Sequence, residues 1–526
     1  MKLFGLFILS ALLVHAGADT YLVSITLGAD RLEPLQSDFD IVLELENTAL
    51  IVIDGSELHN LSPYHSRVLD TDPVPGPYYL VYSPDPRFAL DAYGEILLKD
   101  GNNYLLKITS GIVESLMHEQ VRMRRLSLQP MLFRDPSPLP DVTFNQTVQD
   151  IVSLVDADTI LASVQRLQDF ISRYSTYDSC FAAATHIADL FTQYGCDTVY
   201  FQDHTYGHAP NVIGIKRGEV YDDSNYVIIC GHFDATSYAQ PAIAPGADDN
   251  ASGTVGALEA ARVLNNYDFE YEIRYIAFSG EEFGLYGSEY YAAQAAAQND
   301  NILAVFNADM IAYADIAPED MDVIAKNANP ACGPLADFFI AVADTYTTLL
   351  TYKHMVNDMG YSDHAPFWDH GYLALLNIED WWVNNPWYHT PGDTIGSGYN
   401  DHDLCTETIK AEIAAVATMA VPYETGIDEM TNGDLGTTMM TIMPTVSASR
   451  FSVQLNATRL SDAALEIFNL YGQRVTTLDL PREIGSPTTI VWDATGKDGK
   501  QLPAGVYIVK MRSGSVSQSE KIIILE

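Results

Sequence analysis

Several runs in the middle of the sequence end on side chains that bind metals. Imidazole nitrogens and carboxylate oxygens are the ligands that zinc takes in catalytic sites. A side chain at the carboxyl end of a strand in an open α/β sheet points into the crevice where such sheets bind ligands. The candidates are His232, the pairs Asp248-Asp249 and Glu281-Glu282, Asp309 and His389. Together they supply the nitrogen and oxygen ligands that two zinc ions require.

The neighbouring carboxylates suggest that their roles differ. Two adjacent carboxylates raise each other's pKa unless a cation or a proton is shared. In Glu281-Glu282, one carboxylate can ligate a metal while the other addresses a bound water. Either aspartate of the other pair has two oxygens and can bridge two cations, which a histidine cannot do. Asp234, two residues after His232, can orient that imidazole.

Each of these groups has an ordinary alternative when it is considered alone. The aspartate pair in APGADDNASG also suits a solvated turn, and the glutamate pair also suits an acidic helix start. A loop histidine such as His389 is more often satisfied by local hydrogen bonds. The metal-site hypothesis therefore depends on the whole set.

The elements that must position these groups lie in residues 150–425. LASVQRLQDFISRY and CFAAATHIADLFTQY carry apolar residues at helical spacing, whereas NVIGIKRG, YVIICGH and EIRYIAFSG are short and apolar. Short apolar runs are typical of buried parallel strands. The alternation predicts an α/β domain with a mainly parallel central sheet flanked by helices.

The segments on either side of this domain are rich in strand patterns. Residues 19–145 contain alternating runs such as TYLVSITL and carry no catalytic constellation, so we expect a β-rich propeptide or accessory domain. Prolines from Pro136 to Pro140 mark its end. Residues 426–442 are polar and read as a linker, and residues 443–526 predict a small β-sandwich.

The amino terminus and the charge bear on location and partners. Residues 1–18 have a lysine, a short apolar run and Ala16 and Ala18, which predict a signal peptide, although a core helix or membrane anchor stays open. No later stretch is apolar enough to span a membrane. The net charge of -42 argues against nucleic-acid binding. We expect a secreted or cell-surface protein. Of its five cysteines, Cys332 and Cys405 are a possible disulfide pair that the sequence leaves open.

Five ordered motifs, GHFDA, PGADDNASG, FSGEEFGLYGS, NADMI and YHTPGDT, resemble the motif series of the M28 family of metallopeptidases over residues 150–425. The resemblance implies a zinc exopeptidase-like fold in which Asp249, and not Asp248, bridges two zinc ions. It further implies that Glu281 is the general base and that Asp234 supports His232. The implied ligands are His232 and Asp309 on one ion and Glu282 and His389 on the other.

Two further segments resemble known families. MGYSDHAPFWDHG implies a substrate pocket lined by Tyr361, Asp363 and His364, or a loop that only holds the pocket wall. The C-terminal runs, among them LEIFNLYGQRV and GVYIVKM, are similar to the sorting domains of type IX secretion cargo and to flagellar-hook-like sandwiches. This similarity implies contact with a secretion machinery, and a plain accessory β-sandwich is the alternative.

With these observations, the resemblance implies a secreted aminopeptidase with two zinc ions that removes N-terminal residues from peptides. A metal-bound water would attack the scissile carbonyl, with Glu281 as general base. One alternative is a glutaminyl cyclase, which resembles this fold and uses a single zinc. The other is a surface binding protein without activity, although the intact ligand set and Glu281 speak against it.

Overall fold

The computed structural model describes most of the chain, and every structural statement below concerns these residues. It divides the chain into two compact units, Met1–Tyr423 and Glu424–Glu526. The predicted signal peptide, residues 1–18, and most of the predicted linker lie outside the described residues. The described residues are 19–28, 33–109, 111–134, 137–220, 225–239, 242–357, 359–380, 385–423, 440–443, 446–447, 449–455, 464–469, 474–478, 488–497, 499–513 and 516–525.

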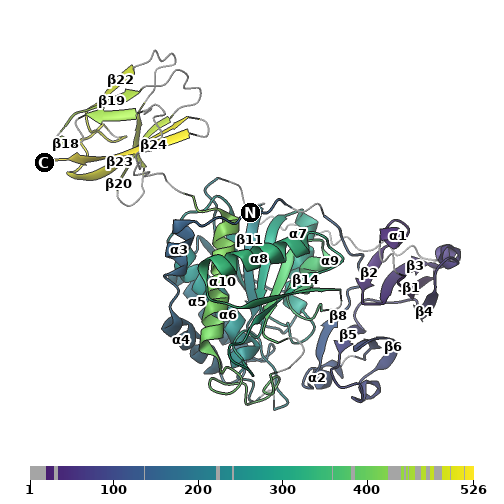
Figure 1. Cartoon of the computed structure of the whole chain (residues 1–526). Coiled ribbons are helices and arrows are strands. Elements are labelled where there is room, and N and C mark those ends of the chain that lie inside the picture. Colours follow the sequence, from purple (N-terminus) through teal and green to yellow (C-terminus); the bar gives the residue numbers. More distant parts are fainter. Residues whose placement is uncertain are drawn as a thin grey trace, which may run out of the picture. The chain divides into compact units, whose positions relative to one another are not determined.

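The core of the first unit is an eight-stranded sheet (Figure 1). Its four central strands, β16, β13, β11 and β12, are parallel, and antiparallel pairs join them to the outer strands on both sides. In order across the sheet the strands are β15 (Thr351–Val356), β14 (Met321–Lys326), β16 (Ala374–Ile378), β13 (Asn301–Ala308), β11 (Asn225–His232), β12 (Glu272–Phe278), β10 (Asn211–Lys216) and β9 (Thr198–Gln202). The mainly parallel centre agrees with the prediction.

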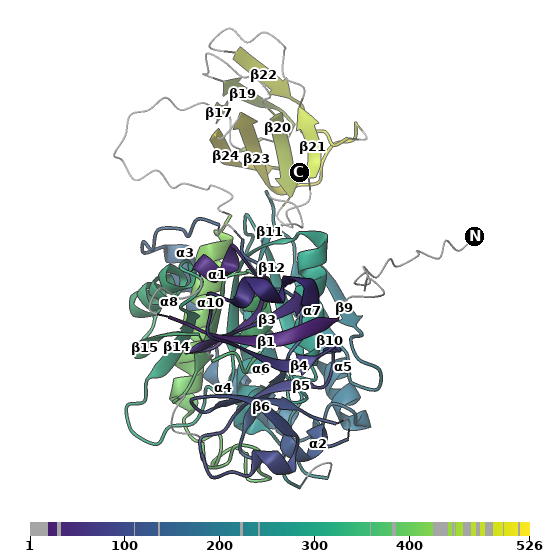
Figure 2. The same cartoon turned by 90° about the vertical axis from the view of Figure 1, so that its right-hand side faces the viewer.

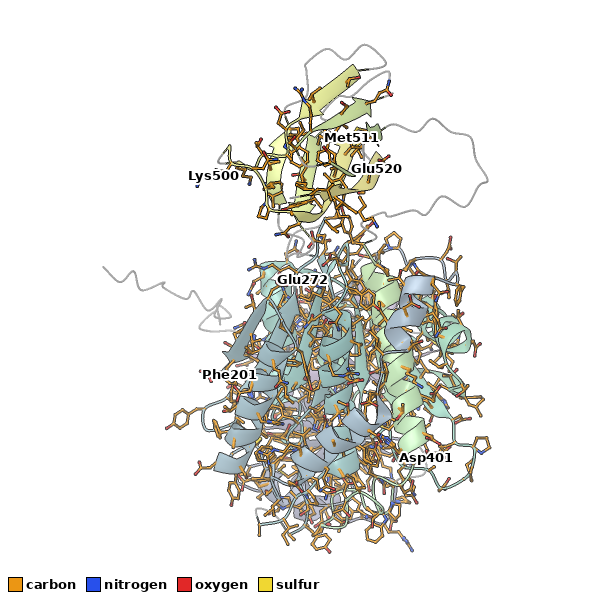
Figure 3. The ribbon with its side chains drawn as sticks, turned by 90° about the vertical axis from the view of Figure 1, so that its left-hand side faces the viewer. Phe201, Glu272, Asp401, Lys500, Met511 and Glu520 are labelled. Atoms are coloured by element: carbon orange, nitrogen blue, oxygen red, sulfur yellow. The ribbon has the colours of Figure 1, made fainter. Side chains whose placement is uncertain are left out.

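Helices flank this sheet and bury the apolar faces of its strands. The interior of β11 is buried without interruption because helices α6 and α10 pack against it. Asp401, labelled in Figure 3, caps α10 by accepting a hydrogen bond from the Leu404 N–H at 2.9 Å. The helices are α3 (Gln146–Val152), α4 (Ala157–Gln168), α5 (Asp178–Gln193), the π-helix η3 (Ala247–Ser252), α6 (Gly253–Leu264), α7 (Tyr286–Gln298), α8 (Cys332–Tyr346), α9 (His364–Asp369) and α10 (His402–Ala420).

The N-terminal segment consists of two small antiparallel sheets with the same topology, which lie in front of the central sheet in Figure 2. Across each sheet, the strands lie in the order second, third, first and fourth along the chain. The first contains β1 (Thr20–Thr26), α1 (Glu33–Gln36), β2 (Ile41–Glu44), β3 (Thr48–Asp54), η1 (Gly55–Leu61) and β4 (Ser66–Thr71). The second contains β5 (Tyr78–Tyr82), η2 (Leu90–Ala92), β6 (Glu95–Asp100), β7 (Asn103–Lys107), α2 (Val113–Leu116) and β8 (Arg122–Arg125). This internal repeat is not visible in the sequence.

The N-terminal sheets share buried side chains with the α/β domain. Tyr79 on β5 and Met117, directly after α2, pack in one hydrophobic cluster with Tyr174 and Phe283 of the larger domain. Burying such side chains removes apolar area from water at about 25 cal/mol per Å², so the joint cluster stabilises the contact. The segment is therefore packed as part of the same unit.

The second unit is a β-sandwich with its own hydrophobic core. Phe451, Trp492 and Met511, the last labelled in Figure 3, are buried between its sheets. One sheet has the order β17 (Met440–Met443), β19 (Phe451–Leu455), β22 (Thr488–Trp492). The other has the order β18 (Val446–Ser447), β24 (Val516–Ile524), β23 (Gly505–Ser513), β20 (Ala464–Asn469), β21 (Arg474–Leu478).

Two further sequence expectations can be compared with this structure. None of the helices in the described ranges combines the length and hydropathy of a membrane-spanning segment. All five cysteines have free thiols, so Cys332 and Cys405 are not bonded to each other.

Candidate metal centre

The strand order brings the predicted metal ligands to one edge of the central sheet. β11 lies between β12 and β13 and runs parallel to both, so the three strands end at the same edge. His232 is the last residue of β11, Asp309 follows β13, and Glu281 and Glu282 follow β12. Asp249 joins them from η3, and His389 comes from the loop before α10.

One group of ligand atoms surrounds the imidazole of His232. Its Nε2 atom lies 3.4 Å from Asp309 Oδ1 and 3.5 Å from Asp249 Oδ1. A carboxylate oxygen of Glu281 lies 3.9 Å from the same nitrogen. The ligand atoms of His232, Glu281 and Asp309 lie within 4.8 Å of one another, as do those of His232, Asp249 and Glu282, so each set is close enough to share one metal ion.

A second group surrounds His389. Its Nε2 atom lies 2.9 Å from Glu282 Oε2 and 3.5 Å from Asp249 Oδ2. The two oxygens of Asp249 therefore face different histidines, Oδ1 facing His232 and Oδ2 facing His389. A carboxylate placed in this way can bridge two cations.

The unsatisfied polar atoms of the cluster fit a metal. His232 Nε2, His389 Nε2 and Asp309 Oδ1 are buried and have no hydrogen-bond partner among the described residues. Buried polar atoms without partners are rare, because losing water costs about 1–3 kcal/mol for each group. Metal coordination would satisfy all three atoms.

The crowded carboxylates also favour a cation. Burial, followed by repulsion from Glu282, raises the pKa of Asp249 well above its ordinary value. Burial and the neighbouring carboxylates likewise raise the pKa of Glu281 and of Glu282. Bound divalent cations would oppose both effects and stabilise the ionised carboxylates.

Backbone carbonyls orient the two imidazoles. The Nδ1 atom of His232 lies 3.1 Å from the carbonyl oxygen of Asp234, and 3.7 Å from its carboxylate. Asp234 Oδ1 instead accepts a hydrogen bond from the Glu281 N–H at 3.3 Å. The Nδ1 atom of His389 lies 3.1 Å from the carbonyl oxygen of Glu119, in the N-terminal segment. Such contacts would fix which ring nitrogen faces a bound metal.

Two residues that the sequence analysis did not single out hold the loop of Asp249. The carboxylate of Asp393 accepts hydrogen bonds from the N–H groups of Asp248, at 3.0 Å, and Asp249, at 2.9 Å. The fully buried guanidinium of Arg173 donates to the carbonyl oxygens of Phe233 at 2.7 Å and Gly246 at 2.7 Å. It also donates to those of Leu167 and Pro245.

We expect Arg173→Met to lower the free energy of unfolding by about 3–5 kcal/mol, because four buried carbonyl oxygens would lose their donor. Denaturant unfolding followed by intrinsic fluorescence would measure the change. Arg166→Met is the matched control, since Arg166 is exposed and packs over the Phe170 ring. Equal destabilisation by the two variants would contradict this role of Arg173.

A pocket that is partly open to solvent, with about 310 Å³ of space between its atoms, adjoins the ligand cluster. Of the predicted pocket residues, Tyr361 lines this cavity. Asp363 and His364 are fully buried and do not line it, and His364 Nε2 lies 2.9 Å from the Met359 carbonyl oxygen. The lining consists of Arg122, Asp249, Glu281, Glu282, Asp309, Met310, Tyr361, Ser362, Leu376, Ile378 and Tyr388.

Comparison with family models gives two matches. Residues 211–411 match peptidase family M28, and residues 440–516 match the FlgD Ig-like domain. The second match agrees with the predicted C-terminal sandwich.

Two curated relatives have aminopeptidase names. The chain is 29% identical over 215 residues to aminopeptidase YwaD of Bacillus subtilis, covering 39% of this chain and 44% of that protein. It is 32% identical over 228 residues to leucine aminopeptidase 1 of Sclerotinia sclerotiorum, covering 40% of this chain and 56% of that protein. The chain thus spans about half the length of these two relatives.

A solved structure supports the fold. The LapA aminopeptidase of Legionella pneumophila superposes with a TM-score of 0.50 and 17% identity, covering 76% of this chain and 98% of that chain. The fold therefore agrees with that of this solved structure, and the match to peptidase family M28 covers residues 211–411.

Proposed function

We propose that the chain is a secreted zinc aminopeptidase with two zinc ions per chain. The observation that carries this proposal is the placement of Asp249, whose two oxygens face different histidines. His232 and Asp309 would hold one ion, Glu282 and His389 the other, and Asp249 both. The aminopeptidase names of the relatives support the choice of reaction.

Bound zinc would polarise the scissile carbonyl and lower the pKa of an attacking water toward about 7. The protein's own contribution begins with Glu281, which takes the proton from the water and delivers it to the leaving amine. Glu281 is suited to this work because it is largely buried in the cavity wall and Asp234 holds its backbone N–H. Tyr361 lines the same cavity, and its hydroxyl, which donates to Asn103 Oδ1 in the structure, would exchange that hydrogen bond for one to the reacting carbonyl.

The apolar part of the cavity indicates which N-terminal residues are accepted. Met310, Leu376 and Ile378 line it beside the ligand carboxylates. An apolar wall of this kind buries an aliphatic side chain favourably, by about 1.5–3 kcal/mol for a leucine-sized group. We therefore propose that peptides with an aliphatic N-terminal residue are preferred.

The test compares peptides that begin with leucine and carry a free or an acetylated amino terminus. Zinc-loaded full-length protein is incubated with both, and mass spectrometry identifies which end is shortened. Stepwise loss of residues from the free amino terminus, with the acetylated peptides intact, supports the proposal. Cleavage of acetylated peptides only, or conversion of N-terminal glutamine to a cyclic product without hydrolysis, contradicts it.

The C-terminal unit should be dispensable for turnover. None of the predicted metal-site residues lies in its described part, and it has a separate core. We expect a chain ending at Tyr423 to keep kcat for a soluble peptide within about twofold of the full chain. A large loss of kcat in the truncated, folded and zinc-loaded protein would contradict this separation. We propose a role in export or surface attachment for this unit.

A further inference from the structure

An acid in the core of the α/β domain has no charged partner. Glu412 lies on α10, the long green helix of Figure 1, and is fully buried. Its Oε1 atom accepts a hydrogen bond from Asn377 Nδ2 at 2.7 Å. No basic side chain in the described part of the chain forms an ion pair with Glu412. Burying a carboxylate without a counter-ion costs free energy, which favours the protonated form.

Two buried oxygen atoms of the same pair lack a donor. They are Asn377 Oδ1 and Glu412 Oε2, and neither has a hydrogen-bond partner among the described residues. Amide oxygens and ionised carboxylate oxygens only accept hydrogen bonds, so an ionised Glu412 leaves both atoms unsatisfied. A protonated carboxyl donates through its O–H. With the proton on Oε2, the acid and the amide share two hydrogen bonds in one ring, and both atoms are satisfied.

The surroundings of Glu412 also favour the uncharged form. Burial raises the pKa of Glu412 to about 8, against the hydrogen bond from Asn377, which lowers it. Oε2 faces α6 at Gly256, where an added Cβ atom would lie 3.4 Å away. Two thiols are close enough to feel the charge of Glu412, Cys230 on β11 and Cys405 on α10, and burial with the nearby acids raises the pKa of both. These neighbours offer no positive charge that would stabilise a carboxylate.

Asn377 connects this acid to the cavity beside the proposed metal ligands. Leu376 and Ile378, which flank Asn377 on β16, line that cavity. Side chains of a strand alternate between its two faces, so Asn377 points away from the cavity. The carbonyl oxygen of Asn377 accepts a hydrogen bond from the Asp309 N–H at 3.1 Å. A contact that holds Asn377 therefore holds the end of β16, which forms part of the cavity wall.

We propose that Glu412 keeps its proton, closes a ring of two hydrogen bonds with Asn377 and in this way positions the end of β16. Glu412 is a positioning residue, because it acts through Asn377 and does not line the cavity itself. The ring concerns only side chains of this protein, whereas its effect on substrate binding rests on the proposed function. The experiments measure these two parts separately.

The first experiment replaces Glu412 by glutamine in the zinc-loaded full-length protein. Glutamine has the shape of the protonated acid and offers one donor and one acceptor to Asn377, so the ring stays closed. We expect Glu412→Gln to unfold at the same temperature as the unaltered protein at pH 7, or at a higher one. Glu412→Leu leaves the Asn377 amide without partners and should lower the unfolding temperature by about 4–10 °C. Equal losses in both variants would overturn the inference.

The second experiment measures how the unfolding temperature depends on pH. The pKa of Glu412 is about 8 in the folded protein and about 4.3 in an unfolded chain, so the folded protein retains a proton that the unfolded chain releases. The resulting stabilisation is complete below about pH 4 and is lost as the pH rises through about 8. The unaltered protein should therefore lose stability relative to Glu412→Gln between about pH 5 and 8. A difference that does not change with pH would contradict the proposal.

Glu407→Gln is the matched control, because Glu407 lies on the same helix but has ionic partners. Lys410 Nζ lies 2.7 Å from Glu407 Oε1, and the Thr348 N–H donates to Oε2 at 2.8 Å. Burial opposes ionisation here, but these partners outweigh it and lower the pKa of Glu407 below its ordinary value of 4.5. The difference between Glu407→Gln and the unaltered protein should therefore stay nearly constant between about pH 5 and 8.

Infrared spectroscopy detects the proton directly. The C=O stretch of a protonated carboxyl absorbs apart from the bands of carboxylates and amides. We expect this band in the difference spectrum between the unaltered protein and Glu412→Gln at pH 7, and we expect it to fade above about pH 8. A difference spectrum with carboxylate bands alone would overturn the inference.

Kinetics with a leucyl peptide measure the effect on the site. Because Leu376 and Ile378 belong to the apolar wall, Glu412→Leu should raise KM by about 3- to 10-fold and keep kcat within about twofold, and Glu412→Gln should change neither. An unchanged KM in Glu412→Leu would overturn the positioning role. If the unaltered protein trims no free-amine peptide, the proposed function fails, while the unfolding temperatures and the infrared band still decide on the ring.

Discussion

Replacing Glu281 by glutamine should lower kcat by about 10²- to 10⁴-fold and leave the zinc content unchanged. Glutamine keeps the size and the hydrogen bonding of the side chain but cannot accept a proton. Glu281 Oε2 lies 3.9 Å from His232 Nε2, which is close enough for Glu281 to be a metal ligand instead of the general base. The substitution distinguishes these two roles. Metal analysis beside steady-state kinetics would give both numbers.

The neighbouring residue provides the matched control. Glu282 Oε2 lies 2.9 Å from His389 Nε2, so Glu282→Gln should weaken zinc binding, since an amide is a poorer ligand than a carboxylate. If Glu281→Gln lost zinc while Glu282→Gln kept both ions, the roles of the two neighbours would be exchanged.

Asp249→Ala should lower the zinc content more than Glu282→Gln does. Among the described ligands, Asp249 is the only residue whose oxygens face both histidines. We expect loss of at least one zinc per chain and a fall in kcat/KM of more than about 10³-fold, since two-metal sites act on nucleophile and carbonyl together. Zinc analysis after dialysis and hydrolysis of a leucyl peptide would measure the two effects.

Asp248→Asn tests whether the bridging role belongs to the second aspartate alone. Asp248 is buried, but its Oδ1 accepts from the Ala312 N–H at 2.9 Å and its Oδ2 from the Asn385 side chain at 2.9 Å. Its substitution should lower stability and spare the zinc. Metal loss in Asp248→Asn with full metal content in Asp249→Ala would reverse the assignment.

The sequence predicted the sheet and the neighbourhood of the site for a physical reason. His232, Glu282 and Asp309 each follow a buried apolar strand, and parallel neighbours must end at one edge of the sheet. Spacing alone could not choose between Asp248 and Asp249. That choice depends on which carboxylate faces the histidines. The loop conformation decides this, and the loop is held by the hydrogen bonds that Asp393 accepts from the N–H groups of Asp248 and Asp249.

The contributions from distant segments could not be predicted from the sequence. Arg122 and the carbonyl of Glu119 belong to a β-rich segment without a catalytic motif, and only the packing of that segment brings them to the site. Arg173 resembles any basic residue between two helices, yet it is fully buried and donates only to backbone carbonyls. A single arginine gives no periodic or spacing signal that would reveal such a role.

The most direct test of the proposed two-metal centre is the number of zinc ions per folded chain. The full-length protein would be stripped with a chelator, titrated with zinc, dialysed and analysed by mass spectrometry of the metal, with leucyl-peptide hydrolysis followed at each step. We predict that binding saturates at two zinc ions per chain and that hydrolysis reaches its maximum only there. Saturation at one ion, with full activity at that point, would contradict the account.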